Sequence, residues 1–118
     1  MLQRYKLVFF TPPAPLPDIK KAIFDAGAGR YPPSSSNSNP EAVYTETMWT
    51  SAPGTGQFRP GDGANPAIGK VGEVEEVEEV RCEVLCVGKE TVKAAVEALR
   101  KSHPYEVPAY EVYTIEDF

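Results

Sequence analysis

The sequence has few of the residues that most often bind metals or form disulfides. It contains one histidine, His103, and two cysteines, Cys82 and Cys86. One histidine excludes a dinuclear or three-histidine metal centre built from this chain alone. The cysteines lie four residues apart in a β-branched run that predicts a strand, which places their Cα atoms roughly 13 Å apart, beyond the roughly 7 Å that a disulfide tolerates. We therefore expect two buried thiols that do not pair with each other.

Long apolar runs and concentrated positive charge are also missing. No stretch approaches the roughly 18 consecutive apolar residues of a membrane-spanning helix, and residues 1–6 lack the pattern of a signal peptide. The net charge is −5, and the basic residues are scattered without interleaved aromatic residues. Such a chain repels phosphate backbones and anionic membranes on average. We therefore expect a cytoplasmic protein that binds neither nucleic acid nor membrane.

Proline and glycine, in contrast, are plentiful. The 118 residues include 12 prolines and 9 glycines, which excludes an all-helical bundle and predicts many turns. The length suits one domain, 1–118, with one core. Residues 32–40 are rich in Ser, Pro and Asn and have nothing to bury, so we expect a flexible surface loop there.

The remaining sequence alternates strand-like and helix-like patterns. Strands are predicted at 5–11, 42–50, around 57–58, and at 80–87 with an acidic entry at 73–79; the last is at 109–115. One helix is predicted from Pro17 to the glycines at 27 and 29, and a second ends before Pro104 with Val92, Ala95 and Leu99 on its buried stripe. This order predicts an α+β, ferredoxin-like βαββαβ sandwich, an antiparallel sheet with two helices on one face.

The predicted strands carry apolar residues on both faces, whereas helices cover only one. Val8 and Phe10 alternate with Leu7 and Phe9, and the later strands repeat this pattern. An apolar face left in water marks an interaction surface. We therefore expect a homo-oligomer that buries the open face of the sheet.

The segment 54–72 carries six glycines but no complete phosphate-binding motif. Gly54-Thr-Gly56 has Arg59 where a dinucleotide fingerprint needs its third glycine, and the later glycines have the wrong spacing for a phosphate loop. Glycine amides still surround an anion without either motif. The candidate ligand-binding residues are Gly54, Gly56, Arg59, Asn65, Lys70 and Tyr105. The alternative is that the glycines serve tight turns that need positive φ.

His103, Tyr105 and Glu106 form the one cluster with reactive side chains. His103 and Glu106 are candidate ligands for a divalent metal, the one candidate cofactor, but two ligands need completion by a neighbouring subunit. The acidic residues of 73–79 also attract cations, or simply form a solvated strand edge. In the alternative interpretation His103 caps the helix and Tyr105 packs at a subunit boundary.

Several stretches together resemble one known family. They are 26–29, 54–60, 63–69, 76–81 and 103–110, and they span nearly the whole chain outside the serine-rich loop. The sequence resembles the YqfO-type domain of Nif-three-like (NGG-interacting-factor) proteins, in its stand-alone form. The resemblance implies a fold similar to CutA and PII signalling proteins, which associate as trimers, and the 103–108 segment looks like a CutA segment linked to divalent-metal tolerance.

Two departures weaken the metal hypothesis that the resemblance implies. Thr47 stands where many relatives have cysteine, and Val107 replaces a commoner glutamate. The larger relatives have been labelled a second type of GTP cyclohydrolase, with a dinuclear metal centre whose ligands belong to flanking domains. The resemblance therefore does not transfer that activity to this chain.

Three functions follow as hypotheses. The leading one is a non-enzymatic, oligomeric binding or regulatory module that holds a small anionic ligand in clefts between subunits. A homotrimer is favoured over a dimer. The second is a divalent-metal-binding, CutA-like protein. The third is an enzyme or sensor acting on a small nucleotide or phosphorylated metabolite.

Overall fold

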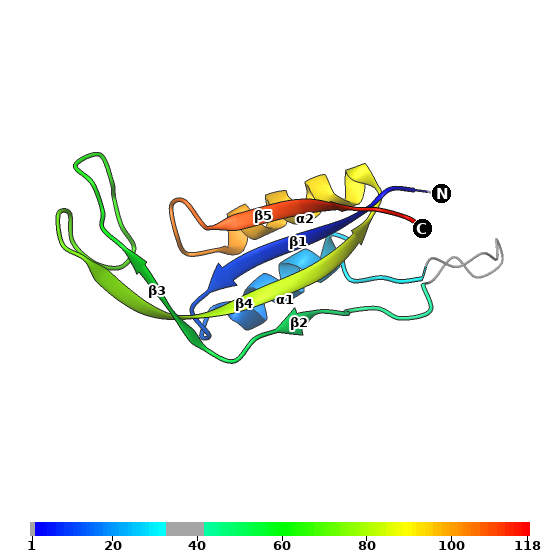
Figure 1. Cartoon of the computed structure of the whole chain (residues 1–118), viewed down its shortest axis with the longest axis horizontal. Coiled ribbons are helices and arrows are strands. Elements are labelled where there is room, and N and C mark those ends of the chain that lie inside the picture. The colour runs from blue at the N-terminus through cyan, green and yellow to red at the C-terminus, as the bar shows by residue number, and fades with distance from the viewer. Residues whose placement is uncertain (1, 33–41) are drawn as a thin grey trace.

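The computed structural model describes residues 2–32 and 42–118. The predicted loop at 32–40 therefore lies, apart from Pro32, outside the described residues. The elements are β1 (Arg4–Thr11), α1 (Leu16–Asp25), β2 (Trp49–Thr50), β3 (Gly54–Phe58), β4 (Glu75–Val87), α2 (Lys89–Ser102) and β5 (Tyr110–Ile115). The antiparallel sheet has the order β2-β4-β1-β5, and β3 also pairs with β4. The two helices lie side by side behind the sheet (Figure 1), which confirms the predicted ferredoxin-like arrangement.

The core lies between the sheet and the two helices. Alternate residues of β1 and β4 point into it, and each helix adds residues three or four positions apart. Its fully buried members include Leu7, Phe9, Ile19, Ile23, Cys82, Val84, Cys86, Ala95 and Leu99. Cys82 and Cys86 are free thiols, as the strand spacing predicts. Burial raises the pKa of the Cys86 thiol to about 11, so this thiol stays protonated near neutral pH.

One predicted strand is wrong over most of its length. The alternation at 42–50 predicts a continuous strand, but only Trp49 and Thr50 pair with β4. Before them, the amide and the hydroxyl of Thr47 both donate to the carbonyl of Gly29, and Glu46 has φ 54°, which interrupts the extended backbone. The segment therefore pairs with the chain that follows α1. Gly29 is required there, since a Cβ at this position would lie 2.8 Å from the Thr47 carbonyl oxygen.

Strand β4 has 13 residues and is longer than its neighbour β1, which has 8. Residues 80–87 of β4 pair with β1, whereas residues 75–79 pair with β3. We call residues 54–79, which comprise β3, the connecting loop and the first part of β4, the arm. The arm extends past the helices at one end of the molecule (Figure 1), which measures 56 × 26 × 23 Å.

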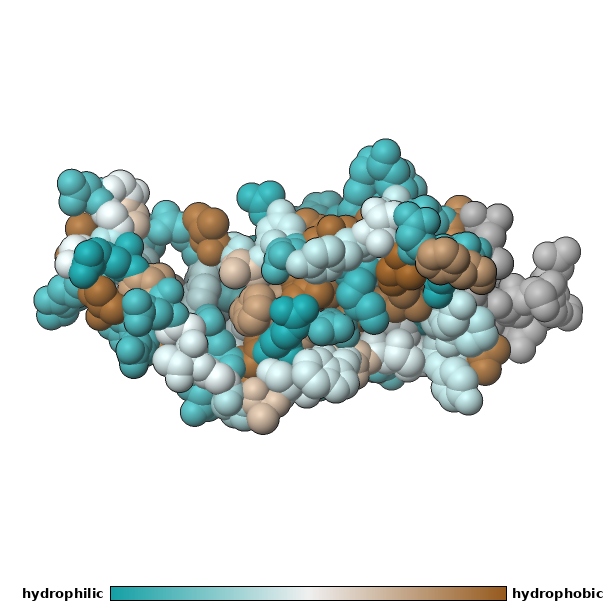
Figure 2. All heavy atoms as spheres, viewed as in Figure 1, coloured by the Kyte–Doolittle hydropathy of each residue, from teal (hydrophilic) through white to brown (hydrophobic). Residues whose placement is uncertain are grey.

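The sheet face away from the helices mixes apolar and charged side chains. Val8 is 1% exposed there, while Trp49 and Tyr113 are 57% and 47% exposed. Apolar surface alternates with hydrophilic surface over the strands in Figure 2. Glu83 and Glu111 flank Val8 on the neighbouring strands. We call this the open face.

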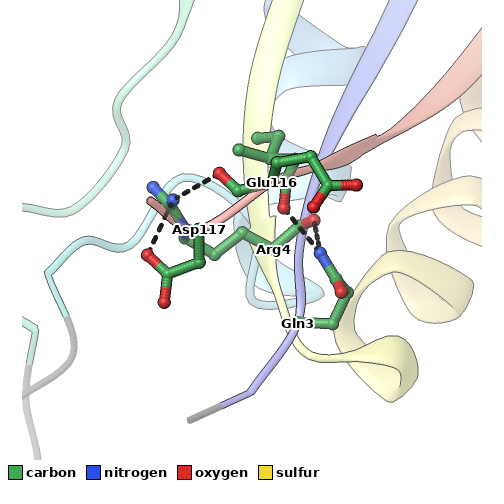
Figure 3. A network of polar contacts seen from close by, with 5 residues as sticks. Gln3, Arg4, Glu116 and Asp117 are labelled. Carbon is green, nitrogen blue, oxygen red and sulfur yellow. Dashed lines mark hydrogen bonds and ion pairs between the residues drawn. The ribbon is translucent and has the colours of Figure 1, made fainter.

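The two ends of the described chain meet at the end of the sheet opposite the arm. Arg4 pairs with Ile115 in the register of β1 and β5. The Gln3 Nε2 donates to the Ile115 carbonyl at 2.7 Å, and the Arg4 guanidinium lies 3.6 Å from the Asp117 carboxylate (Figure 3). These contacts hold the last strand against the first. No helix among the described residues has the length and apolar character needed to cross a membrane.

Leu99 tests the importance of the helix-to-sheet core. It is fully buried, so Leu99→Ala is expected to lower the free energy of unfolding by about 2 to 5 kcal/mol, because it leaves a cavity. Val43 is 64% exposed, and Val43→Ala is expected to change the free energy of unfolding by less than about 0.5 kcal/mol. Urea denaturation of both variants measures these differences; similar losses would contradict the assigned core.

Candidate functional site

A cavity of about 390 Å³ lies between the arm and the turn that joins α2 to β5. The surface in Figure 2 is notched where the arm leaves the body. Residues of both segments line the cavity: Gln57, Phe58, Arg59, Pro60, Gly61, Ala64, Pro66, Ala67, Ile68 and Glu79 of the arm, and Tyr105, Glu106, Val107 and Ala109 of the turn. This volume is within the usual range for small-molecule sites.

Tyr105 connects the turn to the arm. Its ring lies 6.5 Å from the ring of Phe58, between centroids, and its hydroxyl donates to the Glu79 carboxylate at 3.2 Å. Burial, with the nearby charge of Glu79, raises the pKa of Tyr105 to about 12. The phenol therefore remains a neutral hydrogen-bond donor at physiological pH.

From the sequence, Glu79 is predicted only as one of the acidic residues of 73–79 that attract cations, and sequence reasoning missed its place in this cavity. Its carboxylate folds over β3, where a Cβ on Gly56 would lie 2.0 Å from the Glu79 Oε1. Glycine at position 56 therefore makes room for the carboxylate to reach Tyr105. A Cβ on Gly54 would meet only the Glu79 carbonyl, at 4.0 Å. The signal was available in the sequence as two glycines at alternate positions of a short strand, but the strand register is needed to connect them with Glu79.

The tight-turn interpretation of the glycines holds at some positions and not at others. Gly69 and Gly72 have φ of 86° and 82°, which other residues rarely adopt. Gly54 and Gly56 instead lie in the extended strand β3. At Gly56 the missing side chain leaves space for the Glu79 carboxylate, whereas a Cβ at Gly54 would meet no close neighbour.

The other candidate ligand-binding residues differ in their position relative to the cavity. Arg59 lines the cavity, but Lys70 does not. Asn65 does not line the cavity either, but its backbone amide donates to the Glu106 Oε2 at 2.9 Å. This bond ties the loop of the arm to the turn.

His103 is buried and held by both ring nitrogens. Its Nε2 lies 2.7 Å from the Phe10 carbonyl oxygen, and its Nδ1 accepts from the Tyr105 amide at 3.1 Å. These partners assign the neutral tautomer with the proton on Nε2. Burial lowers the pKa of His103 and outweighs the opposite effects of Phe10 and Glu79. His103 also forms the C-cap of α2, as the alternative interpretation predicts, because Pro104 holds it in extended geometry.

Of the two proposed metal ligands, only Glu106 has acceptor capacity left. A metal on His103 would have to replace one of its two hydrogen bonds, whereas Glu106 accepts from Asn65 through its Oε2 alone. Among residues 2–32 and 42–118, no group of three or more His, Cys, Asp or Glu side chains is placed to hold a metal ion. Metal binding through His103 and Glu106 stays a prediction.

Solved structures place this fold in a known class. CutA1 from Ehrlichia chaffeensis aligns with all of this chain and 86% of its own, with a TM-score of 0.66 at 13% identity. The GlnK–ATP complex of Bacillus subtilis aligns with 96% of this chain and 82% of its own, with a TM-score of 0.57 at 15% identity. At such low identity the similarity establishes the fold alone, a ferredoxin-like domain of the CutA and PII type.

Several longer proteins contain a segment that is similar to this chain in sequence. A Bacillus cereus protein related to NIF3 has a TM-score of 0.75 and 31% identity over 98% of this chain. The proteins named GTP cyclohydrolase 1 type 2 homolog from Bacillus subtilis and Mycobacterium tuberculosis are 39% and 37% identical over 111 and 110 residues. The chain spans 26% of the length of each. No family model matches the sequence. The chain is thus homologous to one segment of the Nif-three-like proteins, which confirms the resemblance of its motifs.

The buried imidazole predicts a pH-dependent stability. Its pKa is lower in the folded chain, so the unfolded chain takes up a proton first as the pH falls below the ordinary value of about 6.5. The free energy of unfolding is expected to fall between about pH 7 and pH 5 in the wild type, and less steeply in His103→Gln. Urea denaturation across this range measures both slopes. Equal slopes would contradict a neutral, buried His103.

Proposed function

We propose that this chain is a non-catalytic binding module that holds a small molecule between the arm and the turn and acts as an assembly of identical copies. The observation that carries the proposal is the cavity itself, in which aromatic walls and Arg59 come together. Clefts with apolar walls and a few convergent polar groups are the usual form of ligand sites.

The lining suits a ligand with a flat ring and an anionic group. Phe58, Tyr105 and Ile68 provide apolar surface for the ring. Arg59 is on the same cavity, and it makes no ion pair with any residue in the described part of the chain. Its guanidinium is therefore available to an anion. The GlnK structure was solved as an ATP complex, which makes nucleotides the first probes to test.

A binding role is better supported than a catalytic one. The one imidazole of the chain uses both nitrogens in structural hydrogen bonds. A general base needs a free position beside the reacting group. The cyclohydrolase name belongs to proteins of which this chain spans about a quarter, so we do not extend that activity to it.

A divalent metal on His103 and Glu106 is the second candidate. CutA1 of Ehrlichia chaffeensis is described as a divalent ion tolerance protein, and its fold is similar. The cost of displacing the hydrogen bonds of His103 argues against this alternative.

The open face supports the assembly. Trp49 and Tyr113 are about half exposed beside the apolar side chains of β1 and β4. Large exposed apolar side chains on one face favour association. We propose that copies of the chain meet on this face, and that the trimer implied by the family resemblance is favoured over a dimer.

Arg59 and Lys70 provide a matched pair for testing the ligand site. In a thermal-shift assay with AMP, GMP, ATP and GTP, at least one nucleotide is expected to raise the melting temperature of the wild type, because a ligand of the folded state stabilises it. Arg59→Ala is expected to lose this shift, whereas Lys70→Ala, outside the cavity lining, is expected to keep it. No shift with any nucleotide would overturn the proposed ligand class, and equal loss in both variants would overturn the site.

The assembly is tested by light scattering at micromolar concentration. The wild type is expected to give about three times the chain mass of 12.9 kDa. Leu85→Lys places a charge on the open face, opposite Lys6 of β1, and is expected to yield monomers because a buried, unpaired charge is costly. Val43→Lys, at an exposed position, serves as the control. A monomeric wild type would contradict the proposal.

A further inference from the structure

The charges in the cavity restrict the ligand further than its shape does. The lining carries two carboxylates, Glu79 and Glu106, and one guanidinium, Arg59. We propose that the cavity selects a purine nucleoside monophosphate, a planar ring with amino or N–H donors and one anionic group, over the corresponding triphosphate. This inference rests on the proposed function and specifies its ligand.

Both carboxylates have acceptor capacity left for a ligand. Glu79 uses its Oε2 for the Tyr105 hydroxyl, and Glu106 uses its Oε2 for the Asn65 amide. Within the described residues, neither Oε1 receives a hydrogen bond from a side chain or from Asn65. A carboxylate has about four acceptor sites. The free oxygens therefore suit the amino and ring N–H groups of a purine.

Glu79 is held in a specific position. It rises from β4, passes the open space beside Gly56, and reaches the hydroxyl of Tyr105. The same carboxylate thus orients an aromatic wall of the cavity and lines the cavity itself. A ring stacked on Tyr105 would have its edge near this acceptor. The arrangement favours a ring with donors on its edge over a purely apolar ring.

The surroundings oppose a chain of phosphates. Arg59 balances one anionic group, whereas each further phosphate adds negative charge near Glu79 and Glu106. Like charges brought together across a binding surface lower affinity. A monophosphate satisfies the single guanidinium without this repulsion.

Calorimetric titration in metal-free buffer tests the inference with AMP and GMP against ATP and GTP. In the wild type, the monophosphate is expected to bind at least about tenfold more tightly than its triphosphate. Glu79→Gln keeps the size of the side chain but removes its charge. This variant is expected to bind the monophosphate about fivefold more weakly, and its ratio of monophosphate to triphosphate affinity is expected to fall toward one.

Glu78→Gln provides the matched control, since it removes the same charge from the neighbouring residue, which is exposed and does not line the cavity. It is expected to leave the ratio unchanged. Glu106→Gln repeats the test from the turn, should Glu79→Gln fail to fold. A triphosphate preference in the wild type, or equal effects of Glu78→Gln and Glu79→Gln, would overturn the inference and leave the proposed function standing. If no nucleotide of either kind binds, the nucleotide-like ligand of the proposed function fails as well.

Discussion

The structure depends on the pairing of β4 with two different partners. From residue 80 onward β4 belongs to the sheet, where every second side chain is buried against the helices. Before residue 80, β4 does not pair with β1; it pairs with β3 instead, away from the helices. An antiparallel ribbon without a packed face is only marginally stable on its own. The arm therefore needs a second attachment to the body, and the turn after α2 provides it.

That attachment is a short series of polar contacts centred on Tyr105. The Tyr105 hydroxyl binds Glu79 of the arm, its amide binds His103, and His103 binds the Phe10 carbonyl of β1. Burial and the charge of Glu79 both raise the pKa of Tyr105. The same charge acts to raise the pKa of His103, but burial outweighs it and lowers that pKa overall. The result is a neutral phenol and a neutral imidazole between the core and the arm. The cavity wall is thus fixed by the same contacts that hold the arm.

Sequence pattern predicts this fold where local and tertiary preferences agree. The apolar periodicities of the helices and the alternation in β4 identify the layers, since one buried face dictates each pattern. The pattern at 42–50 misleads because Thr47 bonds to Gly29, a contact between segments that no local pattern contains. The site follows the same rule. The sequence predicts Arg59 and Tyr105 as ligand-binding residues, and both line the same cavity. Phe58 and Glu79 can be assigned to that cavity only once the register of β3 and β4 is known.

The position of the cavity in the molecule bears on its relation to the longer relatives. The cavity lies at the arm, whereas Gln3 and Asp117 meet at the other end of the sheet (Figures 1 and 3). A relative in which this domain makes up about a quarter of the chain would connect to it at that distant end, given the same fold. The connection itself would then leave the cavity uncovered. The proposed binding at the arm is therefore compatible with the longer proteins, because the contacts among Glu79, Gly56 and Tyr105 lie far from that connection.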